Sequence, residues 1–230
     1  MNRWLATLLV AWVGAAPLPA VETRVWTASP AELMSGSADG IAVGTRGRLY
    51  LAPRTQRLDG ALGRTATVET WSACSGGPGQ LFFGTGPDGL VYRSDENGRG
   101  EVFFDTGEAM VTALQRHSGG DLLAATSPGG RIYRIDPAGN GRLWAETEER
   151  YVWAMAETDG ENVYVATGDR GRVLLVRNDG STDRHFDSGE AHVVELLHHG
   201  GGRLIAGGGG TGRVYAIDPE GFGLVLYDDE

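Results

Sequence analysis

The feature that most constrains the fold of this chain is a repeat with a period of 41 residues. Each copy places a glycine at the same position of this register: Gly89, Gly130, Gly171 and Gly212. A unit of this length cannot bury both of its faces alone, so it must pack between neighbouring copies. The repeat therefore predicts many thin cores between units, with no single central core.

Each copy contains four short apolar segments that are separated by Gly, Pro and Asp. In the third copy these are Val111 to Arg116, Leu122 to Thr126, Arg131 to Asp136 and a stretch around Leu143-Trp144. None has helical periodicity. Four strands per unit and a period in the low forties predict an all-β fold, a β-propeller of four-stranded antiparallel blades. The 37 glycines among 230 residues suit this turn-dense architecture.

About five copies are visible, and they set the expected domain organisation. The first copy is degenerate, because its outer strand near Ala61 is weakly apolar. We expect a signal peptide over residues 1–20 and propeller repeats over residues 21–230. The expected blades span residues 28–67, 68–109, 110–150, 151–191 and 192–230.

The two ends of the repeat region predict an incomplete ring. Propellers commonly close when one terminus donates a strand to the blade formed by the other, which removes exposed sheet edges. Val21 to Thr27 resembles such an outer strand, yet the last copy already has its own in Leu224 to Tyr227. We therefore expect a C-terminally truncated copy of a propeller with six or more blades. A closed five-bladed ring, with Val21 to Thr27 as a linker, is the alternative.

The first twenty residues predict export. One positive charge at Arg3 precedes the apolar run Trp4 to Ala16, and small residues follow, with possible cleavage after Ala15 or Ala20. The run is short for a membrane span, so we expect none in this chain. These features favour a secreted or periplasmic protein.

Charge excludes several classes of function. The net charge is −10, and all 20 basic residues are arginine, scattered without a basic cluster. Nucleic-acid binding is not expected. The absence of lysine removes Schiff-base chemistry and P-loop phosphate binding. Two GxGxxG matches, at Gly84 and at Gly207, precede β-type segments where dinucleotide binding needs a helix, so no cofactor is predicted.

A recurring acid marks the candidate binding face. Glu108, Glu149 and Glu190 share one register position, in the loop that leads from an outer strand to the next inner strand. In propellers these loops lie around the central channel, where ligands usually bind. A partial ring of carboxylates there could attract a divalent cation or a basic partner. Solvated turn chemistry, copied by duplication of Gly-Glu-Ala, is the alternative.

Variable residues on the same face are candidates for an individual site. The residue before the inner strand is Met110, Tyr151 or His192, and the opposing loop tips include Asp88 and Arg170. We add Tyr151, His192, Asp88 and Arg170 to the three glutamates as candidate binding residues. Trp71 and Trp153 share a position in the inner strand, where we expect them to pack between blades.

Metal-dependent and nucleophilic chemistry find no clear candidates. His117 and His199 fall two copies apart, and strand alternation sends His198 and His199 to opposite faces, so we expect surface histidines and predict no metal ligands. Cys74 is the only cysteine and has no neighbouring histidine in the sequence. No GxSxG motif is present.

Two segments carry a resemblance to a known repeat family. Residues 81–95 (LFFGTGPDGLVYRSD) and residues 122–136 (LLAATSPGGRIYRID) resemble NHL-type and related bacterial β-propeller repeats. The resemblance covers about residues 30–230 and implies a fold without implying an activity. Gluconolactonase-like propellers are similar in architecture, but their Glu, Asn and Asp metal ligands cannot be matched here. The WD40 hallmark and the tryptophan-docking motif are also missing.

These observations lead to one functional expectation and two alternatives. The first is a non-enzymatic binding or scaffold module for a protein, peptide or glycan. The second is a metal-dependent hydrolase or lactonase-like enzyme that holds a divalent cation in the channel. The third is the sensory ectodomain of a larger receptor.

Overall fold

The computed structural model describes residues 40–43, 48–51, 69–95 and 97–228. The chain divides into two units, Met1–Gln56 and Arg57–Glu230. In the first unit, β1 (Ile41–Val43) pairs antiparallel with β2 (Leu49–Leu51). Both strands fall within the first expected blade, residues 28–67. The expected signal peptide, the segment Val21 to Thr27 and the region near Ala61 lie outside the described residues.

The described residues of the second unit form four antiparallel sheets of four strands each. We refer to them as sheets A to D. Sheet A consists of β3 (Glu69–Gly77), β4 (Gln80–Gly86), β5 (Leu90–Ser94) and β6 (Gly100–Asp105). Sheet B consists of β7 (Met110–Arg116), β8 (Leu122–Ser127), β9 (Arg131–Ile135) and β10 (Gly141–Glu146). Sheet C consists of β11 (Tyr151–Glu157), β12 (Val163–Gly168), β13 (Arg172–Val176) and β14 (Thr182–Asp187). Sheet D consists of β15 (Val193–His198), β16 (Leu204–Gly208), β17 (Val214–Ile217) and β18 (Gly223–Tyr227).

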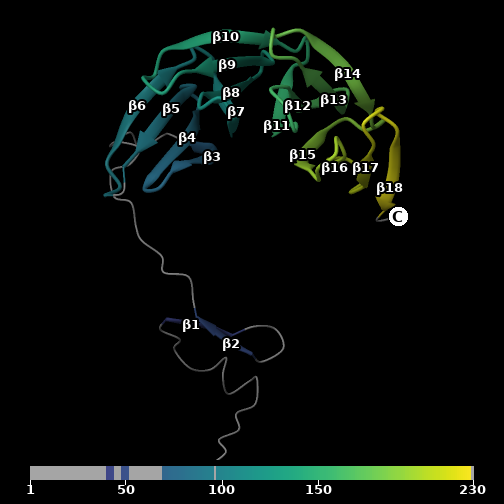
Figure 1. Ribbon diagram of the computed structural model, residues 1–230, viewed down its shortest axis with the longest axis horizontal. Helices are drawn as coiled ribbons and strands as arrows, with labels where there is room; N and C mark the ends of the chain where they lie inside the picture. The colour runs from purple at the N-terminus through teal and green to yellow at the C-terminus, as the bar shows by residue number, and fades with distance from the viewer. Residues whose placement is uncertain (1–39, 44–47, 52–68, 96, 229–230) are drawn as a thin grey trace, which may run out of the picture. The chain divides into compact units, whose positions relative to one another are not determined.

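The four sheets are blades of a propeller. Within each sheet the strands follow one another in chain order, and each neighbouring pair is antiparallel. Figure 1 shows sheets A to D side by side along an open arc, with β3, β7, β11 and β15 on its concave side. The described residues contain no helix. The predicted all-β propeller of four-stranded blades is confirmed, and the arc is open as an incomplete ring would be.

Apolar cores lie between successive sheets. The core between sheets B and C joins Leu123, Ile132 and Trp144 to Val163 and Val165 of the next sheet. Equivalent cores lie between sheets A and B and between sheets C and D. Alternation along each strand sends one set of side chains to the preceding sheet and the other to the following sheet. The expected thin cores between repeats are therefore present.

A β-bulge recurs near the start of every inner strand. The pairing of inner and second strands skips one residue in each sheet: Trp71, Thr112, Trp153 and Val194. A bulge leaves its residue out of the ladder and re-aims its side chain. Each blade therefore has one side chain outside the strand ladder, at the end of the sheet where the glutamate loops lie. The identity of this residue varies from copy to copy.

Candidate functional site

The three loops that carry the glutamates are each held by the same pair of hydrogen bonds, which recurs with the repeat. Thr147 Oγ1 donates to the Gly130 carbonyl oxygen at 2.9 Å, and the Glu149 N–H donates to Thr147 Oγ1 at 3.3 Å. Gly130 has φ +59, and a Cβ there would collide with the Glu149 carbonyl oxygen. The same contacts recur in the neighbouring loops, at Thr106 with Gly89 and at Ser188 with Gly171. Each loop therefore docks against a turn that only glycine fits.

Glu108 binds two side chains of the next blade. Its Oε1 lies 2.5 Å from Arg131 Nη1 and accepts a hydrogen bond from Tyr133 Oη at 3.3 Å. The side chain of Glu108 is 13% exposed. Arg131 also donates to Glu146 of its own blade at 3.1 Å. Glu108 thus connects the loop after sheet A to β9 of sheet B.

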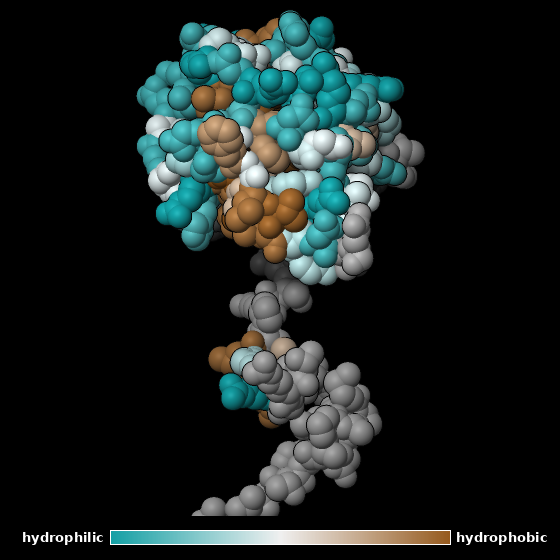
Figure 2. All heavy atoms as spheres, turned by 90° about the vertical axis from the view of Figure 1, so that its right-hand side faces the viewer, coloured by the Kyte–Doolittle hydropathy of each residue, from teal (hydrophilic) through white to brown (hydrophobic). Residues whose placement is uncertain are grey.

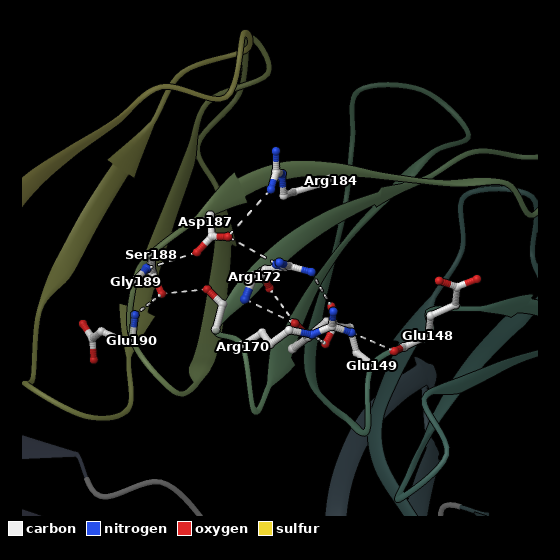
Figure 3. Close-up of polar contacts among 11 residues, drawn as sticks. Glu148, Glu149, Arg170, Arg172, Arg184, Asp187, Ser188, Gly189 and Glu190 are labelled. Carbon is white, nitrogen blue, oxygen red and sulfur yellow. Dashed lines mark hydrogen bonds and ion pairs between the residues drawn. The ribbon is translucent and has the colours of Figure 1, made fainter.

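Glu149 is the most buried of the three, with a side chain only 3% exposed. Its Oε2 accepts from Arg170 Nε at 3.0 Å, and its Oε1 lies 3.3 Å from Arg172 Nη1. Arg170 also donates to the Glu148 carbonyl oxygen at 3.0 Å. Figure 3 shows Arg170 and Arg172 converging on Glu149, with Arg172 also reaching Asp187. A buried carboxylate is stabilised only when it is paired in this way.

Glu190 binds backbone amides where the other two bind arginines. Its Oε2 accepts from the N–H groups of Gly210 and Thr211 at 2.8 and 3.0 Å, and its Oε1 accepts from Tyr215 Oη at 2.7 Å. Burial alone would raise the pKa of Glu190. The Thr211 and Gly210 amides and the Tyr215 hydroxyl together outweigh it, so the pKa lies below its ordinary value.

Each glutamate therefore joins the return loop of one blade to the second half of the next blade. Neither sequence-based interpretation describes this arrangement. A ring of free carboxylates is not formed, because every carboxylate is engaged by donors of its own chain. A solvated turn does not describe Glu149, which is buried, whereas Glu108 and Glu190 are partly exposed. Within the described residues, no group of three or more His, Cys, Asp or Glu side chains is placed to hold a metal ion.

The two loop-tip candidates differ in their contacts. Arg170 forms an ion pair with Glu149, and about half of its side chain is exposed. Asp88 is exposed, and its Oδ1 accepts a hydrogen bond from Thr85 Oγ1 at 2.7 Å within the same turn. These contacts stabilise the loops in which the two residues lie. The role of either residue in binding stays a prediction.

Tyr151, Trp153 and His192 form a cluster at the bulge of sheet C. The rings of Tyr151 and Trp153 stack with centroids 5.2 Å apart, and Arg150 lies 5.0 Å above the Tyr151 ring. Trp153 Nε1 donates to His192 Nδ1 at 3.2 Å. Because indole can only donate, Nδ1 of His192 is the acceptor, and neutral His192 carries its proton on Nε2. That Nε2–H has no partner among the described residues.

Small residues at the ends of the second strands make room for the bulged side chains. A Cβ on Gly168 would meet Trp153 and His192, and one on Gly86 would meet Trp71 and Met110. Trp71 is 47% exposed, so the expectation that it packs between blades is wrong.

In sheet B the equivalent cluster is polar. Thr112 is the bulged residue there, and its Oγ1 lies 3.0 Å from Ser127 Oγ and donates to the Val152 carbonyl oxygen at 2.5 Å. Thr112 and Ser127 are both buried. In sheet B the bulged residue is therefore held by hydrogen bonds. In sheet C the bulged residue is aromatic and contacts two other rings.

The histidines at the other end of the blades are not all on the surface. His117 is only 3% exposed, because it packs edge-on against Trp144 and lies 3.1 Å, through Nε2, from the Glu161 carbonyl oxygen of the next blade. The expectation of a surface histidine is therefore wrong for His117. His198 is half-buried and His199 is exposed.

Sequence reasoning missed the partners of the glutamates. Arg131, Arg172 and Arg213 recur at the 41-residue step, and each pairs with an acid 15 residues further on: Glu146, Asp187 and Asp228. Two of these arginines, Arg131 and Arg172, bind Glu108 and Glu149, so the register contains part of this signal. In the described residues, no helix has the length and apolar character needed to cross a membrane.

Comparisons with known proteins agree on the fold. No protein-family description and no curated protein matches the sequence. Selenomethionine-substituted virginiamycin B lyase from Staphylococcus aureus has a similar structure, with a TM-score of 0.63 and 13% identity over 83% of this chain. The match covers 63% of the lyase chain, so this chain spans less than two thirds of that protein.

Two further solved structures are similar. Regucalcin, a calcium-binding protein from Agrobacterium tumefaciens, has a TM-score of 0.55 at 14% identity, covering 66% of this chain and 57% of its own. YCF48 bound to D1 peptide has a TM-score of 0.52 at 15% identity, covering 77% of this chain and 57% of its own. At such low identity these similarities show the fold alone. The predicted resemblance to β-propeller repeats is confirmed at that level.

Proposed function

We propose that this protein is a non-enzymatic binding module that takes an extended peptide segment on the face formed by the glutamate loops and the bulged residues. The observation that carries the proposal is the cluster at the sheet C bulge. Trp153 is set outside the strand ladder there, and its ring contacts those of Tyr151 and His192. Bulges are enriched beside binding sites, where they re-aim a side chain.

The cluster offers the kind of contacts that a peptide needs. Stacked aromatic rings provide apolar area at a low cost in conformational entropy. The Nε2–H of His192, which has no partner in the part of the chain that the structure describes, can donate to a backbone carbonyl, and the exposed Arg150 adds a positive charge above Tyr151. The similar propeller YCF48 in its complex with D1 peptide is an example of this fold with a peptide bound.

The alternative of a metal-dependent enzyme receives less support from the site. A hard cation needs several oxygen ligands that can turn toward it. The carboxylates of Glu108 and Glu149 are bound by arginine, and that of Glu190 by amides and a tyrosine. We therefore assign these glutamates to the architecture of the face and leave ligand contact to the aromatic cluster.

Selection from a phage library of short random peptides would test the proposal. We expect peptides that bind the wild-type chain saturably and lose about tenfold or more in affinity with Tyr151→Ala or Trp153→Ala. Leu143→Ala is the matched control, because Leu143 is 47% exposed on the outer strand of sheet B, away from the inner-strand bulges. Selected peptides that bind Trp153→Ala as well as wild type would contradict the assignment of the site. Binding to an oligosaccharide array that is lost in the same variants would show that the ligand is a glycan and not a peptide.

Export is part of the proposal, because residues 1–20 predict a signal peptide. We expect that expression of the full chain in a bacterium with a periplasm yields a mature protein that starts after Ala15 or Ala20. Mass spectrometry of the periplasmic fraction would measure the new N-terminus. Recovery of the protein only in the cytoplasm, with residues 1–20 intact, would contradict it.

A further inference from the structure

A cleft lies between sheets A and B, at the end of these blades opposite the glutamate loops. Its volume is about 150 Å³, and it is lined by residues of β4, β5 and β6 of sheet A and of β7, β8 and β9 of sheet B. The apolar walls are Phe82, Phe103, Leu122 and Ile135, which are 0–9% exposed. A cavity of about this volume with Leu, Ile and Phe walls is large enough for one aromatic ring.

The repeat explains why this space is open. Between sheets B and C the equivalent place is filled by His117, whose ring packs edge-on against Trp144 and lies 3.1 Å, through Nε2, from the Glu161 carbonyl oxygen. One repeat earlier, Gly76 stands at the position of His117 and Phe103 at that of Trp144. Gly76 has no side chain to insert, and Phe103 is smaller than Trp144, so these two differences leave a cleft.

Buried walls distinguish the cleft from the apolar side chains on the outer surface. Figure 2 shows the side of the molecule on which sheet D lies, where apolar side chains gather among hydrophilic ones. Leu224 and Leu226 of β18 are 67% and 55% exposed. In the cleft, by contrast, sheets A and B bury the apolar walls from both sides, so a ring placed there is removed from water as in other small-molecule sites.

Two arginines line the cleft beside its apolar walls. Arg93 donates through Nε to Glu101 Oε1 at 3.1 Å, and its guanidinium lies 4.8 Å from the centre of the Phe103 ring. Arg116 donates through Nη1 to the Gly76 carbonyl oxygen at 2.6 Å and has no acid partner in the part of the chain that the structure describes. Arg116 therefore brings an unpaired positive charge to the cleft, with Nε–H and Nη2 donors left for a ligand.

The acid among the lining residues, Asp136, does not neutralise this charge. Its Oδ1 accepts from the N–H groups of Ala138 and Asn140 at 2.9 Å each, and its Oδ2 accepts from the Asn140 side-chain amide at 3.0 Å. These hydrogen bonds use the carboxylate within its own turn. The cleft thus combines a buried apolar volume with a guanidinium, which is the group that binds carboxylates best.

We propose that this cleft binds a small organic acid with an apolar body of about one ring, the size of benzoate. The ring packs against Phe103 and Leu122, and the carboxylate binds the guanidinium of Arg116. This site is separate from the peptide-binding face proposed above, because it lies at the opposite end of the blades.

Fluorine NMR of the full chain titrated with para-fluorobenzoate, and with its neutral counterpart para-fluorobenzamide, tests this proposal. We expect saturable binding of the acid with a Kd of about 1 mM or below, and binding of the amide that is about tenfold weaker or more. Arg116→Gln should weaken binding of the acid to the level of the amide. Phe103→Trp, which introduces the residue of the next blade, should abolish binding of both.

Arg142→Gln is the matched control, because Arg142 is an exposed arginine on β10 that does not line the cleft. It should bind the acid as wild type does, and so should Trp153→Ala. Circular dichroism would verify that each variant folds.

A chain that shows no saturable binding of the acid up to about 10 mM would overturn the proposal. So would equal affinities for acid and amide, or an Arg116→Gln variant that binds the acid as wild type does, because Arg116 would then contribute nothing. Loss of the acid with Trp153→Ala but not with Phe103→Trp would also overturn it, by placing the acid on the peptide-binding face.

Discussion

At the scale of single residues, the three recurring glutamates illustrate what a sequence register can and cannot reveal. The register identifies Glu108, Glu149 and Glu190 as equivalent. It does not reveal that their donors stand 20 to 25 residues further along the chain, on the next blade. Those donors also differ from copy to copy, so no single motif identifies them. Only the docking of the loop on the next blade brings them together.

Glu190 should make folding stability depend on pH. Its pKa in the folded state lies below the ordinary value of 4.5, so it contributes stability above that pH, and this contribution is lost as the pH falls through the folded pKa. We expect Glu190→Gln to be less stable than wild type at neutral pH and to lose less stability on acidification below about pH 4.5. Urea unfolding at several pH values would measure both. Parallel pH profiles for variant and wild type would contradict the depressed pKa.

Cys74 should be an unreactive thiol. Burial raises its pKa to about 11, although Arg116 acts in the opposite direction. At pH 8 only about one thiol in a thousand is then ionised, and the thiolate is the reactive form. We expect slow modification by a disulfide reagent in the native protein and fast modification in urea. Equal rates in the two conditions would show that Cys74 is accessible.

At the scale of strands and turns, the sequence predicts most of what the structure shows. The four segments expected in the third copy correspond to β7 to β10, because turn residues bound each apolar stretch. The bulges were not predicted, because a one-residue skip in pairing leaves no mark in a pattern of apolar residues. Trp71 is one of the residues that the bulges set outside the ladder, and it is 47% exposed where packing between blades is expected.

The turn glycines provide a test at this scale. Gly130 and Gly120 both have positive φ, but a Cβ on Gly130 would collide with the Glu149 backbone, whereas one on Gly120 would meet open space. We expect Gly130→Ala to cost about 3 kcal/mol or more and Gly120→Ala about 1–2 kcal/mol, as backbone strain alone. Urea unfolding of the two variants would give both values. Equal costs would mean that the loop does not dock on Gly130 as described.

At the scale of the whole molecule, the period of the repeat is enough to predict a propeller, because units of this kind can only stack side by side. The open arc of sheets A to D agrees with the expectation of an incomplete ring. The face that carries the glutamate loops could be located from the sequence, since the repeat defines those loops. Its chemistry could not, because whether a carboxylate there is free or paired depends on contacts between blades.

The central claim is that the recurring glutamates hold successive blades together and that the bulged aromatic residues are left to contact a ligand. Urea unfolding of Glu149→Gln and its neighbour Glu148→Gln tests this claim most directly. Glu149 is buried between two arginines, whereas Glu148 is exposed. We predict a loss of about 1–3 kcal/mol in the free energy of unfolding for Glu149→Gln, because hydrogen bonds to a charged group are weakened, and almost none for Glu148→Gln. An unchanged stability for Glu149→Gln would contradict the claim and would return this glutamate to the candidates for ligand or cation binding.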